Sequence, residues 1–79
     1  MILHIRKLTA YNTIMNYYRI YQQLIDKRKN KDILPSDIYK EIHHIKPRSC
    51  QGTNDPDNLV ALTAREHLIA HKLLYRMYR

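Results

Sequence analysis

Three blocks of sequence decide the fold: EIHHIKPR at residues 41–48, NLVALT at residues 58–63 and REHLIAHKLL at residues 65–74. Side chains of residues 39–45 alternate between two faces, and residues 58–62 form a short apolar run, which predicts two strands. The connection between them, residues 46–57, is rich in proline, glycine, asparagine and aspartate, which favour turns. The first two blocks therefore predict a strand, a loop and a second strand.

The third block predicts a helix from Ala64 to about Tyr75. Thr63 and Glu66 have the spacing of a capping box, in which the hydroxyl accepts from one backbone amide and the carboxylate from another. The expected core face of this helix consists of Ala64, Leu68, Ile69 and Leu73.

A second helical pattern precedes these blocks, in residues 9–30. Its apolar side chains recur at helical spacing, namely Ile14, Tyr17, Tyr18, Tyr21, Leu24 and Ile25. We expect Thr9 to cap the start and Asn30 to end the helix in a left-handed conformation. The tyrosines follow the apolar stripe, so packing explains them better than base stacking does. The predicted fold class is α+β, with the whole chain, residues 1–79, as one domain.

Four histidines lie within the three blocks. His67 and His71 are four residues apart on the predicted helix, so they share one face and are able to bind one ion, although this spacing also arises by chance. His43 and His44 are neighbours on the first strand, where side chains point to opposite faces. We therefore expect a bulge at the end of that strand, which would turn both rings toward one site.

Length, charge and cysteine content narrow the class of protein. A chain of 79 residues has room for one small core, and its single cysteine, Cys50, excludes an internal disulfide and a cysteine-based zinc site. This composition is typical of an intracellular protein. The net charge of +7 indicates an anionic polymer or surface as partner. No apolar run approaches the roughly 20 residues of a membrane span.

Taken together and in order, the three blocks resemble the HNH, or ββα-metal, endonucleases, especially the homing type encoded by bacteriophages. The resemblance covers roughly residues 39–75, and it is specific because all blocks occur at workable spacing. It implies a β-hairpin packed on a helix with one divalent metal ion between them. It also implies a metal-dependent endonuclease that hydrolyses phosphodiester bonds of DNA.

The resemblance also assigns roles to individual residues. His44 would be the general base, and His43, His67 and His71 would bind the metal. Asn58 would orient the His44 ring through a hydrogen bond across the hairpin. Glu41 would support a ligand histidine or an arginine, although an exposed strand carboxylate explains it equally well. Mg²⁺ or Mn²⁺ is the expected working ion, and Zn²⁺ or Ni²⁺ would also bind an imidazole-rich site.

DNA is the expected partner, because the charge and the resemblance agree on it. The candidate phosphate contacts are Lys27, Arg28, Lys29, Arg48 and Arg65. The rival hypothesis is a catalytically inactive DNA-binding or assembly module with a structural, histidine-bound metal. His44 argues against that rival, because a structural site needs no further imidazole beside its ligands.

The residues leave the assembly and the extent of the protein open. Monomer and homodimer are both compatible with the pattern. Phage homing nucleases carry a further DNA-binding region after this domain, whereas here the helical pattern continues to the last residue. We therefore expect a minimal or truncated nuclease, with nicking or weakly specific double-strand cleavage.

Overall fold

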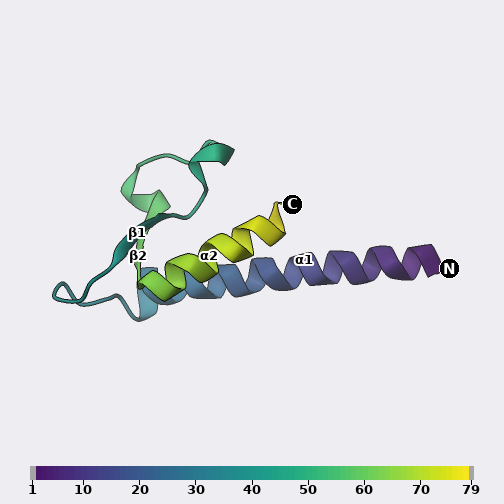
Figure 1. The fold of residues 1–79 in the computed structure, drawn as a ribbon, viewed down its shortest axis with the longest axis horizontal. Coiled ribbons are helices and arrows are strands. Elements are labelled where there is room, and N and C mark those ends of the chain that lie inside the picture. The colour runs from purple at the N-terminus through teal and green to yellow at the C-terminus, as the bar shows by residue number, and fades with distance from the viewer. Residues whose placement is uncertain (1, 79) are drawn as a thin grey trace.

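The computed structural model describes residues 2–78, and within them the side chains of residues 12–78. The elements are helix α1 (Ile2–Asp26), a π-helical turn (Lys27–Lys31), strand β1 (Glu41–His44), 3-10 turns at Arg48–Cys50 and Pro56–Asn58, strand β2 (Leu59–Leu62) and helix α2 (Ala64–Met77). Helix α2 runs antiparallel along the C-terminal half of α1, and the hairpin lies beside this pair (Figure 1). The predicted α+β class and ββα order are confirmed. Within residues 2–78, no helix is long and apolar enough to cross a membrane.

Helix α1 is longer than the sequence pattern predicts. It begins at Ile2, so the expectation that Thr9 caps its start is wrong. At its other end, the chain continues into the π-helical turn, where the Asp32 amide donates to the Lys27 carbonyl at 2.6 Å. Asn30 lies inside this turn and does not adopt the expected left-handed conformation, and its side chain donates to Asp26 at 2.8 Å.

The core lies where α1, α2 and the hairpin meet. Its buried apolar side chains are Tyr21, Ile25, Val60, Leu62, Ala70, Leu73 and Leu74. On α1, the predicted stripe is correct for Tyr21 and Ile25, whereas Ile14 and Tyr18 are exposed. On α2, only Leu73 of the expected face is buried.

The predicted core face of α2 is wrong, because this helix has apolar side chains on both sides. Leu68 and Ile69 are exposed, and the side that packs against α1 carries Ala70, Leu73 and Leu74 instead. The capping box of Thr63 and Glu66 is confirmed, with both hydrogen bonds present at 3.0–3.1 Å. This cap fixes the start of α2 directly after β2.

The hairpin is regular, which contradicts the predicted bulge. β1 and β2 pair antiparallel over four residue pairs, with His43 opposite Val60 and His44 opposite Leu59. The side chain of His43 is buried, and that of His44 lies on the other face of the strand. Both nevertheless line one hollow, because that hollow lies at the end of β1 and reaches both faces of the strand.

The loop between the strands is closed by the side chain of Asn58. Its Oδ1 accepts from the Lys46 amide at 2.8 Å, and its Nδ2 donates to the carbonyls of Lys46 and Thr53 at 3.1 and 2.8 Å. Gly52 sits inside this ring, where its amide donates to the Pro47 carbonyl at 2.9 Å. The loop is therefore held as a compact unit beside the end of β1.

We expect Gly52→Ala to lower the free energy of unfolding by about 1–3 kcal/mol, as overpacking does elsewhere. A Cβ at this position would overlap the Lys46 carbonyl oxygen. Thermal unfolding followed by circular dichroism measures the change. Ser49→Ala, in the same loop at an exposed position, is the control and should unfold like the unsubstituted chain. Equal midpoints for all three chains would contradict the expected overlap.

Candidate metal centre

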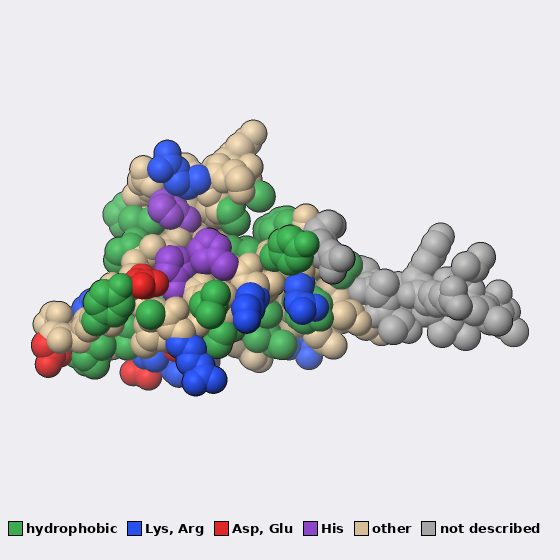
Figure 2. Space-filling model, viewed as in Figure 1, with side chains coloured by type: hydrophobic (Ala, Val, Ile, Leu, Met, Phe, Trp, Pro, Cys, Tyr) green, Lys and Arg blue, Asp and Glu red, His purple; other side chains and the backbone are tan. Residues whose placement is uncertain are grey.

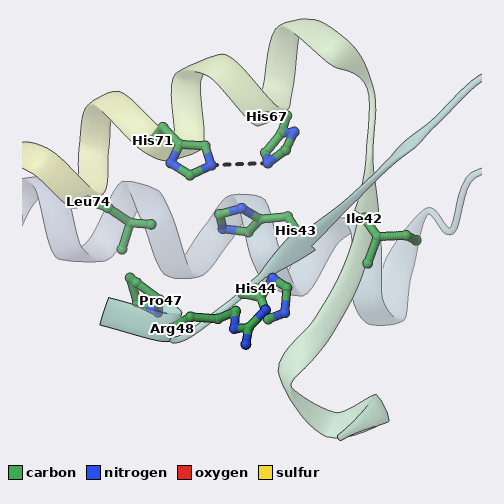
Figure 3. Close-up of a pocket in the computed structure, with 8 residues that line it drawn as sticks. All are labelled: Ile42, His43, His44, Pro47, Arg48, His67, His71 and Leu74. Carbon is green, nitrogen blue, oxygen red and sulfur yellow. Dashed lines mark hydrogen bonds between the residues drawn. The ribbon is translucent and has the colours of Figure 1, made fainter. Parts of the chain in front are cut away.

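A hollow of about 320 Å³ lies between the end of β1, the following loop and α2. It is lined by Ile42, His43, His44, Pro47, Arg48, His67, His71 and Leu74 (Figure 3). Four of the five histidines of the chain therefore meet here, from segments that are up to 28 residues apart in sequence. Figure 2 shows histidine side chains gathered on one face of the molecule.

Three of these histidines have the geometry of a metal site. One ring nitrogen from each of His43, His67 and His71 lies within 4.8 Å of the other two. The Nε2 atoms of His67 and His71 are 3.1 Å apart. Two nitrogens that bind one tetrahedral ion at 2.0–2.1 Å stand about 3.3 Å apart. A small shift would therefore let both rings bind the same ion.

The environment of His43 fits the same interpretation. Its Nε2 lies 2.8 Å from the Tyr21 hydroxyl, while its Nδ1 is buried and has no hydrogen-bond partner among the described residues. Burial, together with the nearby His67, His71 and His44, lowers the pKa of His43 to about 4. The ring is therefore neutral near pH 7, as a metal ligand must be. A buried, neutral ring nitrogen without a hydrogen-bond partner fits the role of a metal ligand.

Glu41, in strand β1, is hydrogen-bonded to His67 of helix α2. His67 Nδ1 donates to the Glu41 carboxylate at 2.8 Å, so the Nε2 of a neutral ring is left with its lone pair toward the cluster. The Tyr39 hydroxyl donates to the other carboxylate oxygen at 2.7 Å. These hydrogen bonds, first that from Tyr39 and then that from His67, lower the pKa of Glu41. An ionised carboxylate behind a histidine is a common support for metal ligands.

His44 is oriented differently from the expectation. Its Nε2 donates to the Asn54 side-chain oxygen at 2.7 Å, and Asn58 does not bond to the ring. The structure does not show the expected hydrogen bond between Asn58 and His44, because the Asn58 side chain bonds to the loop backbone instead. Sequence reasoning missed Asn54, Tyr39 and Tyr21. Asn54 lies in the loop, outside any periodic pattern. The strand alternation includes Tyr39 but does not indicate its hydrogen bond to Glu41, and the apolar stripe of α1 suggests only packing for Tyr21.

Comparison of the sequence with models of known protein families identifies the family of this chain. The model of the HNH endonuclease family matches residues 28–72, which is more than half of the chain. The chain belongs to the HNH endonuclease family.

Relatives of this HNH chain are found in Enterobacteria phage T4. Its probable mobile endonuclease E is 50% identical over 64 residues, which cover 81% of this chain and 44% of the relative. Probable mobile endonucleases B and D are 49% and 48% identical, over 82% and 81% of this chain and about a quarter of their own lengths. The chain thus spans less than half of these relatives. No solved structure matches it.

The basic residues of the HNH chain fall into two groups. The Arg28 side chain is only 11% exposed, and its Nε donates to both oxygens of Glu66 at 2.9 and 3.0 Å. Lys29 donates to the carbonyls of Pro56 and Leu59, both at 2.7 Å. These two residues join the π-helical turn after α1 to the hairpin and α2. Both side chains are therefore engaged within the chain, and a contact of either with DNA stays a prediction.

The other three candidate DNA contacts remain available. Lys27, Arg48 and Arg65 are exposed, and none of their side chains has a hydrogen-bond or ion-pair partner within residues 12–78. Arg48 lines the hollow itself, next to His44 (Figure 3). An anionic ligand in the hollow would therefore meet at least one guanidinium group that has no competing internal partner.

Proposed function

We propose that this chain is a metal-dependent endonuclease that hydrolyses phosphodiester bonds of DNA. The observation that carries the proposal is the meeting of His43, His67 and His71 within 4.8 Å, in the same hollow as a fourth histidine, His44. Three imidazoles leave coordination positions of an ion open, and a catalytic site requires an open position. Family membership and the names of the phage relatives support the same activity.

The three clustered histidines would hold the ion, with Glu41 fixing the His67 ring. When bound, the ion supplies a Lewis acid that polarises the scissile phosphate and neutralises charge on the leaving oxygen. His44 would accept the proton of the attacking water. Because its Nε2 donates to Asn54, the lone pair of the neutral ring is on Nδ1, which is therefore the atom that takes the proton. Asn58 would act indirectly, by holding the loop that carries Asn54.

The working ion is proposed to be Mg²⁺ or Mn²⁺. A set of three imidazoles binds Zn²⁺ or Ni²⁺ more tightly, so these ions would also occupy the site. Neutral ligands favour the softer ions, whereas the phosphate substrate supplies the oxygen atoms that Mg²⁺ and Mn²⁺ prefer. The ion that binds most tightly and the ion that supports the fastest cleavage are therefore expected to differ.

DNA is the proposed partner, held through Arg48, Arg65 and Lys27. These contacts would be made to phosphates, which position the duplex without reading its sequence. The phage relatives suggest action on DNA inside a host cell.

Cleavage of supercoiled plasmid tests the proposed function. We expect nicked or linear product with Mg²⁺ or Mn²⁺, and none in the presence of a chelator until excess metal is restored. The 5′ ends of the product should carry phosphate, which ligation to a hydroxyl-ended acceptor detects. If the chain binds DNA but leaves the plasmid intact in every divalent metal, it is a binding module and the proposal is wrong.

We also expect Arg48→Ala to weaken binding to a short duplex and to reduce the dependence of affinity on salt. Loss of one phosphate contact lowers the slope of log affinity against log salt by about 1. Fluorescence anisotropy at several salt concentrations measures both. Arg48→Lys, which keeps the charge, should retain most of the slope. A slope unchanged in Arg48→Ala would remove this residue from the DNA contacts.

A further inference from the structure

Tyr21 connects helix α1 to the histidine cluster. It is 2% exposed, and its hydroxyl oxygen lies 2.8 Å from His43 Nε2 and 2.6 Å from the Ile45 carbonyl oxygen. It belongs to α1 and lies seven residues before the segment that the HNH family model matches. Nothing in the family match therefore assigns it a role.

The protons of this hydrogen-bond chain can be counted. A hydroxyl has one proton to donate, and the Ile45 carbonyl is able only to accept, so the Tyr21 proton points to Ile45. The second hydrogen bond of the hydroxyl must then be one that it accepts from His43, which requires a proton on Nε2. A neutral ring protonated at Nε2 has its lone pair on Nδ1.

The nitrogen selected in this way is the one without a partner. His43 Nδ1 is buried and makes no hydrogen bond with the described residues. The centre of the His43 ring is 5.2 Å from that of His67 and 5.3 Å from that of His71, both in edge-on arrangements. A buried acceptor is costly without a partner, and a cation between the three rings would supply one.

We propose that Tyr21 is a positioning residue that fixes the tautomer and orientation of His43, so that this histidine binds metal through Nδ1. Helix α1 then contributes to the metal centre through this hydrogen bond, in addition to packing in the core. The inference rests on the proposed function in one respect, namely that the three clustered histidines bind the ion. Hydrogen bonding of a ligand's second ring nitrogen commonly changes metal affinity by 10- to 100-fold.

The same helix offers a matched control. Tyr17 lies one turn before Tyr21 and is partly buried, and its hydroxyl accepts from Arg76 at 3.3 Å instead of from a histidine. Tyr21→Phe and Tyr17→Phe each remove one hydroxyl from the same face of α1. Only the first removes a hydrogen bond to a proposed metal ligand.

Calorimetric titration with Zn²⁺ alone, without DNA, tests the proposal. We expect Tyr21→Phe to bind Zn²⁺ about 10- to 100-fold more weakly than the unsubstituted chain, and Tyr17→Phe to bind like it. Equal affinity in Tyr21→Phe, or equal losses in both variants, would overturn the proposal. Absence of Zn²⁺ binding by the unsubstituted chain would be a different result, because it would contradict the metal site itself and the proposed function with it.

A second measurement tests the proposed tautomer of His43 even if Tyr21→Phe does not fold. In the metal-free, unsubstituted chain, the ¹⁵N chemical shifts of the His43 ring report which nitrogen carries the proton. We expect the proton on Nε2. A proton on Nδ1 would overturn the proposal, because that nitrogen would then be unable to face the ion as a ligand.

Discussion

Replacing His44 by alanine is expected to lower the rate of DNA cleavage by roughly 100- to 10,000-fold, the range that general bases contribute. His44 lines the hollow beside the three clustered histidines, but its ring is bonded to Asn54 and is not a member of the cluster. The variant should therefore bind metal as the unsubstituted chain does. Single-turnover cleavage of a labelled duplex, with metal affinity measured separately, tests both statements.

His71→Ala provides the comparison for His44→Ala. It removes a member of the cluster, so it should lose metal affinity and cleavage together. If His44→Ala instead loses metal affinity to the same extent as His71→Ala, His44 is a ligand and the assignment of the base is wrong. If it cleaves at an unchanged rate, another group accepts the proton.

Replacing Arg28 by alanine is expected to unfold much of the protein. The Arg28 and Glu66 side chains are only 11% and 15% exposed, and removing Arg28 leaves a largely buried carboxylate without its ion-pair partner. We expect a loss of about 2–4 kcal/mol, which is comparable to the whole stability that a core of this size supplies. Chemical denaturation followed by circular dichroism measures the free energy of unfolding.

Arg65→Ala is the matched control, because Arg65 is exposed and adjacent in sequence to Glu66. Its stability should stay within about 0.5 kcal/mol of the unsubstituted chain, as for most surface substitutions. If Arg28→Ala is as stable as Arg65→Ala and loses only DNA affinity, then Arg28 is a DNA contact after all and the structural role is wrong.

The same pair also makes stability depend on pH. Burial alone would raise the pKa of Glu66, but hydrogen bonds from Arg28 and Thr63 outweigh it and lower the pKa below its usual value. This stabilisation is present above the pKa of an unfolded glutamate, about 4.3, and is lost as the pH falls through the lower, folded value. We expect the stability of the unsubstituted chain to decline in this acidic range more steeply than that of Glu66→Gln. Parallel declines would contradict the coupling.

The hairpin, the second helix and the histidine cluster could be predicted because each depends on local spacing. His67 and His71 share a helix face whatever the rest of the chain does, and the capping box sets the start of that helix within a few residues. His43 joins the pair through the order of the strands, which the family resemblance supplied. The pair of His67 and His71 and the helix cap therefore need no knowledge of long-range packing, whereas the place of His43 rests on the resemblance.

The features that could not be predicted depend on contacts between distant segments. Arg28 was expected to bind phosphate, but it meets Glu66, which is 38 residues away. Tyr21 was expected only to pack, since the position of His43 against α1 is set by the tertiary fold. The face of α2 was mistaken because Leu68 and Ile69 satisfy the helical period as well as Leu73 and Leu74 do. Periodicity alone does not say which of two apolar faces meets the core.

Anomalous diffraction from crystals grown with Mn²⁺ or Zn²⁺ tests the central claim most directly. We expect one ion bound by His43, His67 and His71 at about 2.0–2.2 Å, with at least one open coordination position on the side of the hollow that His44 and Arg48 line. An ion at another place, or one whose coordination is closed by a fourth protein ligand as in a structural site, would contradict it.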